Sequence, residues 1–157
     1  MKTIFLICKV TTLIIIFSSC TNSKIDNQIN QDKLIKEARH LYGEKKYKEA
    51  KLIYNQILKN DSTNSEAFFN RGICNSKTDD FVGALLDYQR SVNLNYRIED
   101  AYFNIACCYG AMEVYDRAIV YFKIVLLMDP NESNAKVELE KLNKLIASKS
   151  KRADVSL

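Results

Sequence analysis

The stretch that decides the fold is EDAYFNIACCYGAMEVYDRAIVYFKIVLLMDPNE, residues 99–132, which ends with the helix-stopping pair Asp129-Pro130. When the sequence is compared with itself, this stretch aligns with residues 65–98 and then with residues 31–64. Five sets of positions match across the three copies without a gap. They are Leu34, Phe68 and Tyr102; Ala38, Gly72 and Ala106; Tyr47, Phe81 and Tyr115; Ala50, Ala84 and Ala118; and Tyr54, Tyr88 and Phe122.

The period of about 34 residues is the length of a helix–turn–helix repeat, and this one resembles the tetratricopeptide (TPR) repeat. That family places a large residue, a small residue, an aromatic, an Ala, an aromatic and a Pro at repeat positions 4, 8, 17, 20, 24 and 32. Repeats at residues 31–64, 65–98 and 99–132 fill nearly every slot. Ser62 and Tyr96 are departures, because only Pro130 supplies the Pro of position 32. The resemblance implies an all-α fold, a right-handed α-solenoid of three TPR helix pairs.

The composition agrees with a helical domain. The chain of 157 residues has one Pro and four Gly, so it contains few helix breakers. Of the 23 basic side chains, Lys2 and Lys9 precede residue 20; the other 21 nearly balance the 19 acidic ones. This balance gives no reason to expect a nucleic-acid partner.

Residues 133–148 are predicted to form one further helix that caps the last repeat. Its apolar residues Ala135, Leu139, Leu142 and Ile146 are spaced by four, three and four, which places them on one helical face. A terminal helix with one apolar and one polar face is what a stack of repeats needs to end in water. We expect residues 149–157 to form a disordered basic tail.

Residues 1–19 have the layout of a secretory signal peptide, with Lys2 near the start and apolar residues up to Phe17. The following sequence FSSC, residues 17–20, resembles the lipobox of bacterial lipoproteins, although Leu is more usual at the place of Phe17. The resemblance implies cleavage before Cys20 and a diacylglycerol on its thiol; an ordinary secreted protein and an uncleaved anchor are the alternatives. Residues 20–30 would then be the lipidated Cys and a polar tether.

The cysteines of the repeats are predicted to pack rather than to react. Cys74, Cys108 and the only histidine, His40, share repeat position 10, which faces the neighbouring repeat, so all three are expected to be buried. Equivalent positions on packed helices lie roughly 8–10 Å apart, too far for a shared metal or a disulfide. Cys107 points the other way.

In the TPR family the concave surface binds partners, and first-helix positions 2, 5, 9, 12 and 13 line it. Carried over to this sequence, the candidate groove is lined by Asp32, Ile35, Arg39, Tyr42, Glu66, Phe69, Ile73, Lys77, Asp100, Phe103 and Cys107. Its middle is apolar, which is typical of a partner site. The sequence predicts a protein or peptide in the groove; the tether or a second copy of the chain are the alternative occupants.

One TPR subtype is excluded. Domains that grip a C-terminal carboxylate use a basic residue and an Asn at positions 5 and 9 of the first repeat, where this chain has Ile35 and Arg39. They also use basic residues at positions 2 and 6 of the third repeat, where this chain has Asp100 and Asn104.

The sequence therefore predicts a binding protein and not an enzyme. With a single histidine there is no Ser/His or Cys/His pair to propose as catalytic, and no glycine-rich phosphate loop occurs. No cofactor or metal is expected. It resembles the TPR lipoproteins of outer-membrane assembly, secretion or pilus machinery. We expect an extracytoplasmic protein that the lipid on Cys20 holds to a bacterial membrane, the outer membrane facing the periplasm. The alternative is a structural lipoprotein whose groove or repeat edge forms a homo-oligomer.

Overall fold

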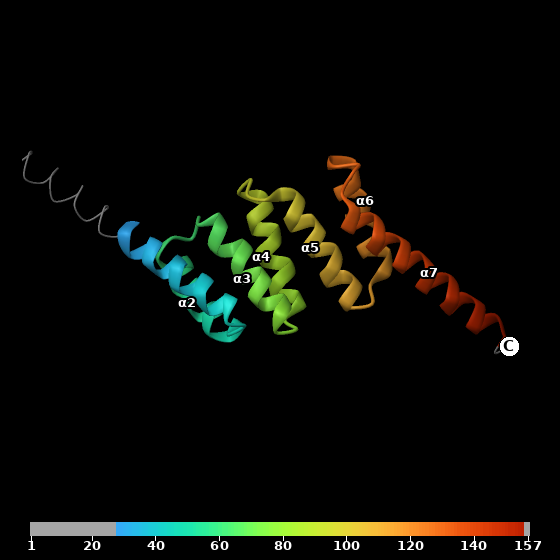
Figure 1. Ribbon diagram of the computed structural model, residues 1–157, viewed down its shortest axis with the longest axis horizontal. Coiled ribbons are helices and arrows are strands. Elements are labelled where there is room, and N and C mark those ends of the chain that lie inside the picture. The colour runs from blue at the N-terminus through green and yellow to red at the C-terminus, as the bar shows by residue number, and fades with distance from the viewer. Residues whose placement is uncertain (1–27, 156–157) are drawn as a thin grey trace, which may run out of the picture.

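The computed structural model describes residues 28–155, and this part of the chain is helical and contains no strand (Figure 1). The all-α prediction is thus confirmed. The first helix spans residues 28–43. It is followed by α2 (Tyr47–Asn60), α3 (Ser65–Lys77), α4 (Phe81–Asn93), α5 (Ile98–Ala111), α6 (Tyr115–Met128) and α7 (Ser133–Val155).

The helices follow one another along the long axis of the molecule and pack against their sequence neighbours from α2 to α7 (Figure 1). In addition, α3 contacts α5, so the first helices of successive repeats touch. Each of the three repeats holds one helix pair. The array is therefore stabilised by contacts within a pair and between adjacent pairs, as in repeat proteins generally.

The turn inside each helix pair uses the same backbone conformation. Lys45, Asp79 and Glu113 occupy equivalent positions in the three repeats, and each has a φ of 60°, in the left-handed region. A left-handed residue after the first helix reverses the chain so that the second helix can pack back on it. None of the three is glycine, so each turn carries some backbone strain.

The core consists of three clusters, and each is completed by the first helix of the next unit. Ala67 and Cys74 of α3 join the first cluster, and Ala101, Ile105 and Cys108 of α5 join the second. Ala135 of α7 joins the third. A helix pair alone would leave this apolar face in water, so each repeat depends on the unit that follows it.

The small residues of repeat position 8 allow the helices of a pair to approach closely. Ala38 and Ala106 are fully buried, and Gly72 is buried against the ring of Tyr88. A Cβ built on Gly72 would lie 2.9 Å from that ring, closer than two carbon atoms can pack. Glycine is therefore the residue that fits between α3 and α4.

Cys74 and Cys108 are 0% and 1% exposed, and both are free thiols. The prediction that they serve as packing residues is confirmed. Each lies in the cluster that joins its helix to the preceding repeat.

The prediction that His40 is buried is wrong: its side chain is 73% exposed. Repeat position 10 faces the preceding repeat, and among the described residues no helix pair precedes the first repeat. The same reason explains Lys33, which is exposed where Ala67, Ala101 and Ala135 are fully buried at the equivalent position. The first helix thus presents a polar face at the start of the array.

The last helix differs from its prediction, because α7 continues to Val155 and does not end at Ser148. Residues 149–155 contain neither Gly nor Pro, so nothing in their sequence stops a helix. Lys149 also contacts the turn between α5 and α6: its Nζ lies 3.0 Å from Glu113 Oε2 and 4.7 Å from the centre of the Tyr115 ring. On the outer face of α7, Lys136 and Glu140 are exposed, which closes the array with polar side chains.

The predicted signal peptide, Cys20 and residues 20–27 of the predicted tether lie outside the described residues. Residues 28–30, predicted as the end of the tether, belong to the first helix. Among the helices that the structure describes, none combines the length and the hydropathy needed to cross a bilayer.

Candidate protein-binding groove

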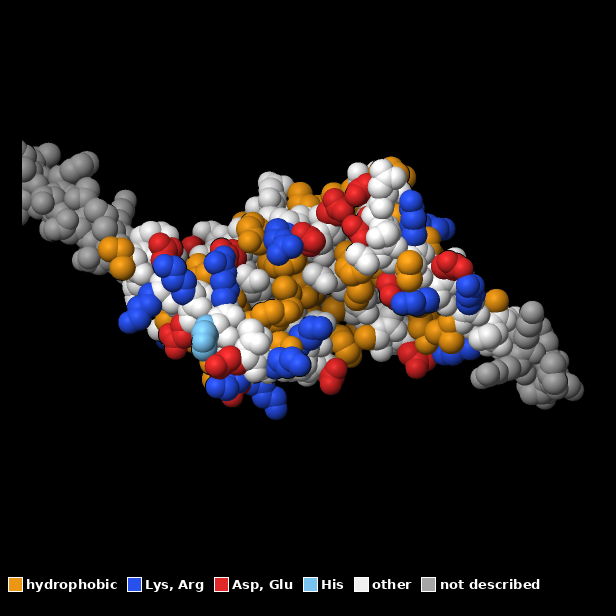
Figure 2. All heavy atoms as spheres, in the orientation of Figure 1, with side chains coloured by type: hydrophobic (Ala, Val, Ile, Leu, Met, Phe, Trp, Pro, Cys, Tyr) orange, Lys and Arg blue, Asp and Glu red, His pale blue; other side chains and the backbone are white. Residues whose placement is uncertain are grey.

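The first helix, α3, α5 and α7 present equivalent faces, and the eleven predicted groove residues lie on the first three of them. Ile35, Ile73, Phe103 and Cys107 are half-buried, and they pack at the edge of the three core clusters. Asp32, Arg39, Tyr42, Lys77 and Asp100 are exposed, and Glu66 is half-buried. Figure 2 shows hydrophobic side chains over the middle of the array, with charged side chains around them. We call this surface, with its apolar middle and charged border, the groove.

The prediction that Phe69 is an open anchor in the groove is wrong, because the side chain is only 1% exposed. Its ring lies edge-on to Tyr88 on one side, with ring centres 5.7 Å apart, and to Tyr96 on another, at 5.9 Å. The guanidinium of Arg97 lies 4.6 Å from the centre of the same ring. Phe69 is therefore a core residue.

The repeat pattern did not predict that Tyr96 and Arg97 cover Phe69, because both residues belong to the connection between α4 and α5. This connection needs two left-handed residues, Asn95 with a φ of 56° and Arg97 with a φ of 45°. The buried Ser91 holds the turn by donating a hydrogen bond from Oγ to the carbonyl oxygen of Tyr96, at 2.8 Å. The sequence did indicate that this connection is unusual, because Tyr96 occupies the position where the repeat pattern has Pro.

Phe103 and Cys107 lie one turn apart on α5 and form the apolar part of the groove in the third repeat. The Phe103 ring packs edge-on against Phe122, with centres 5.5 Å apart. Burial raises the pKa of the Cys107 thiol to about 12, with smaller contributions from Cys108 and Glu138. The thiol is therefore protonated at neutral pH, and it contributes to the groove as an apolar group.

Two acidic residues of the groove border are paired with arginines of the first two repeats. Arg39 forms an ion pair with Glu66 across two repeats. Arg97 Nε donates to Asp100 Oδ2 at 2.8 Å. These pairs neutralise the border of the groove where one repeat meets the next.

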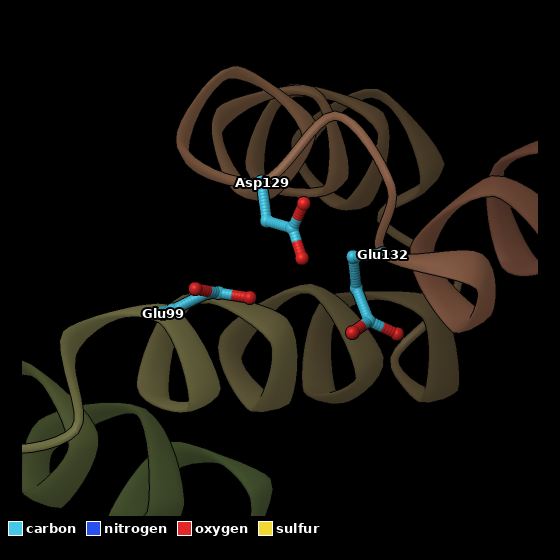
Figure 3. A group of neighbouring side chains, drawn as sticks. All are labelled: Glu99, Asp129 and Glu132. Atoms are coloured by element: carbon cyan, nitrogen blue, oxygen red, sulfur yellow. The ribbon is translucent and has the colours of Figure 1, made fainter.

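A further group of acids lies at the two ends of the third repeat and is arranged differently. Glu99 at the start of α5, Asp129 after α6 and Glu132 before α7 direct their carboxylates toward one another (Figure 3), with one oxygen of each lying within 4.8 Å of the others. Oxygens so close could ligate a hard cation. Figure 2 shows acidic side chains grouped where α5 begins and α6 meets α7.

A pocket of about 160 Å³ opens beside these carboxylates. Its walls are both polar and apolar. They are formed by Glu99, Asp100, Phe103, Val125, Glu132 and Asn134. The pocket thus joins the apolar floor of the groove at Phe103 to its most acidic border.

His40, the only histidine of the chain, lies in the exposed face of the first helix. Its Nδ1 is 3.9 Å from Glu44, beyond hydrogen-bonding distance. The groove does not include it. The arrangement of the groove is therefore suited to binding and offers no histidine for proton transfer.

Residues 100–131 match the family model of the tetratricopeptide repeat. Over 120 residues the chain is 28% identical to human sperm-associated antigen 1, covering 76% of this chain and 13% of that protein. Over 118 residues it is 23% identical to human serine/threonine-protein phosphatase 5, covering 75% of this chain and 24% of that protein. The chain thus spans about an eighth to a quarter of the length of these relatives.

Solved structures of TPR domains have the same fold. The first TPR domain of the human RPAP3 protein has a TM-score of 0.69 at 26% identity, covering 77% of this chain and 95% of that domain. The first TPR of Spaghetti (RPAP3) bound to the HSP90 peptide SRMEEVD has a TM-score of 0.69 at 25% identity, covering 74% and 93%. The Arabidopsis OM64 TPR domain, at 20% identity, has a TM-score of 0.70, covering 75% and 98%. The chain therefore has an all-α, TPR-like fold.

Proposed function

We propose that this chain is a membrane-anchored, extracytoplasmic TPR adaptor that binds a protein or peptide partner in its groove. The observation that carries the proposal is the half-buried apolar strip of Ile73, Phe103 and Cys107 on the face of the first helices. The strip lies between the two polar ends of the array, on the face that the first helices share. Among the similar structures, the first TPR of Spaghetti (RPAP3) is bound to an HSP90 peptide, and the second TPR domain of human RPAP3 is in complex with the HSP70 peptide SGPTIEEVD.

The ligand of this groove differs in chemistry from those two peptides. Both carry acidic residues near their C-terminal ends, whereas Ile35, Asp100 and Asn104 stand here in place of the clamp that grips a terminal carboxylate. An acidic peptide end would also meet Glu66 and the carboxylates beside the third repeat. The groove is better suited to a segment held by apolar side chains, in a helical or extended conformation.

The anchor we propose is a lipid on Cys20, in an outer membrane facing the periplasm. Residues 20–27 precede the described part of the chain, and eight extended residues reach at most about 25–30 Å. The groove would then be held close to the membrane surface, within reach of membrane-bound partners of an assembly, secretion or pilus machine. Two acyl chains are enough for stable anchoring.

Fatty-acid labelling tests the anchor. Cells that express the full-length chain are grown with labelled palmitate, and Cys20→Ala is the matched variant. We expect label on the natural chain alone and a shift of the variant from the membrane to the soluble fraction. An unlabelled natural chain would contradict the lipoprotein proposal.

Partner capture from solubilised membranes tests the groove. Phe103→Ala should weaken capture by roughly 2 kcal/mol, because a half-buried aromatic is the kind of residue that dominates binding. Leu86→Ala is the control, since Leu86 is 65% exposed on α4, outside the groove. Capture that survives Phe103→Ala but is lost in the control would place the binding surface elsewhere.

The alternative function, a self-associating structural protein, makes a different prediction. Polar residues at both ends, such as Lys33 and Glu140, disfavour end-to-end stacking of copies. Self-association would then use the groove or an edge of the repeats, and variants of the groove test the first of these. Light scattering with size-exclusion chromatography on the full-length chain in detergent would show a dimer that Phe103→Ala dissociates.

A further inference from the structure

The end of the groove at the third repeat carries a net negative charge, whereas the acidic and basic side chains along the rest of its border balance. Along the rest of the border, Arg39 and Arg97 each hold a groove carboxylate in an ion pair. In the part of the chain that the structure describes, no Lys or Arg forms an ion pair with Glu99, Asp129 or Glu132. The groove therefore has one neutral end and one acidic end.

Backbone hydrogen bonds hold two of these carboxylates in place. Asp129 Oδ1 accepts from the backbone N–H of Asn131 at 2.8 Å, and Glu132 Oε1 accepts from that of Asn134 at 2.9 Å. These bonds fix the side chains at the turn between α6 and α7, opposite Glu99 on α5 (Figure 3). The repulsion between three neighbouring carboxylates is thus built into the fold, and a cation between them would relieve it.

The pocket beside the carboxylates adds an apolar wall to this charge. Phe103 lines it together with the acids Glu99, Asp100 and Glu132. A volume of about 160 Å³ is enough for one long side chain and too small for a folded element. Lys and Arg side chains have this form, with an apolar stem that packs on a ring and a charged head that reaches a polar rim.

We infer that the acidic end of the groove receives a Lys or Arg side chain of the partner segment. Its stem packs on Phe103, and its cation lies among the carboxylates of Glu99, Asp129 and Glu132. Apolar neighbours of this residue pack on Cys107 and Ile73, which fixes the direction in which the segment lies along the groove. This inference rests on the proposed peptide-binding function, and it names the chemistry of the ligand.

Selection from a phage-displayed library of random dodecapeptides on the full-length chain in detergent tests the inference. We expect the selected peptides to contain a Lys or Arg beside apolar residues and to be poor in Asp and Glu. Replacing that basic residue by norleucine in the best synthetic peptide should raise its Kd about tenfold or more, as expected for loss of a charge-assisted hydrogen bond.

Variants of the chain locate the cation. Glu99→Gln with Glu132→Gln should raise the Kd of the basic peptide about tenfold and leave that of the norleucine peptide unchanged. These isosteric changes remove repulsion, so they should not harm the fold. Glu140→Gln is the control: it removes one negative charge by the same kind of substitution from the outer face of α7, where Glu140 is exposed, and should leave both Kd values unchanged.

The outcomes separate the two proposals. If no selected peptide responds to Phe103→Ala, the groove is not the binding site and the proposed function fails. If the selected peptides bind in the groove but are acidic, or if their affinity is insensitive to the Glu99 and Glu132 changes, the proposed function stands and the inference of a basic ligand is overturned.

Discussion

At the scale of single residues, the three left-handed positions at the helix turns are the clearest source of strain. Lys45, Asp79 and Glu113 adopt the same φ of 60° in three successive repeats. Glycine reaches this conformation without the steric cost that a Cβ imposes. These turns are therefore places where the stability of the chain can be raised.

Lys45→Gly should increase the free energy of unfolding by about 0.5–1 kcal/mol, because it relieves the left-handed strain at an exposed turn. Chemical denaturation would measure the change. Gln56→Gly is the control: the same residue introduced on the exposed face of α2 should destabilise by about 1 kcal/mol. A loss of stability in Lys45→Gly would show that the turn is not strained.

Two glycines should respond in opposite ways to alanine. Gly72→Ala should destabilise by roughly 1–2 kcal/mol despite the better helix propensity of Ala, because the added methyl group meets the Tyr88 ring. Gly110→Ala has nothing within 4 Å of the new Cβ and should stabilise slightly, by about 0.5 kcal/mol. Thermal unfolding of both variants would check this, and equal effects would contradict the close packing of α3 on α4.

At the scale of helices, α7 stands out because it completes the third repeat and, in the part of the chain that the structure describes, is followed by no second helix. It contributes Ala135 to the core cluster of Ala118, Phe122 and Val125, with Leu139 and Leu142 packed against it. Its second half extends beyond this cluster, with the Lys149 contacts to Glu113 and Tyr115. The two halves of α7 should therefore differ in importance.

Two truncations would distinguish these halves. A chain ending at Glu132 exposes the apolar face of α6, so its third repeat should no longer unfold cooperatively with the rest. Hydrogen exchange would show this as faster exchange of the amides of α5 and α6 than in the natural chain. A chain ending at Ser148 loses the exposed contacts of Lys149 and should keep nearly the same Tm. Equal losses in both would mean that the end of α7 is structural.

At the scale of the whole molecule, buried ionisable groups make the free energy of unfolding decrease at alkaline pH. Burial raises the pKa of Cys74 to about 11 and that of Cys107 to about 12, from the ordinary 9.0, and it also raises the pKa of Tyr54 and Tyr88. Above pH 9 the unfolded thiols lose protons that the folded ones keep, so unfolding becomes more favourable as the pH rises.

We expect the free energy of unfolding to fall between pH 9 and 11 by about 1 kcal/mol per pH unit for each buried thiol. Denaturant titrations at fixed pH would measure this slope. In Cys74→Ala the slope should be smaller, although the variant is less stable at every pH. An unchanged slope would show that this thiol ionises in the folded chain as easily as in the unfolded one.

The sequence alone predicted the parts of the fold that repeat. The small residues at Gly72 and Ala84, the aromatics and the buried Cys74 all follow from the repeat period, because each meets the same neighbours in every copy. His40 was misplaced because no helix pair precedes the first copy within residues 28–155, so nothing there covers this position. Phe69 was misplaced because a left-handed turn at Arg97 brings the guanidinium over its ring. No residue pattern in the sequence predicts that turn.

The candidate site was predictable to a similar extent. The period placed Phe103 and Cys107 on the groove face, and the structure finds both half-buried there. The acidic group was not predicted, since Glu99, Asp129 and Glu132 come from three different segments and have no common repeat position. Such groups become visible only when the helices are placed in space.

The sharing of each core cluster with the next first helix also has a consequence for the order of folding during synthesis. Contacts between sequence neighbours favour rapid folding, so each helix pair can form as soon as its chain is available. Yet the first cluster is complete only when α3 has emerged, the second when α5 has emerged, and the third when Ala135 has. The newest helix pair on a growing chain is always the unfinished one, and it exposes its apolar face until about a dozen further residues appear.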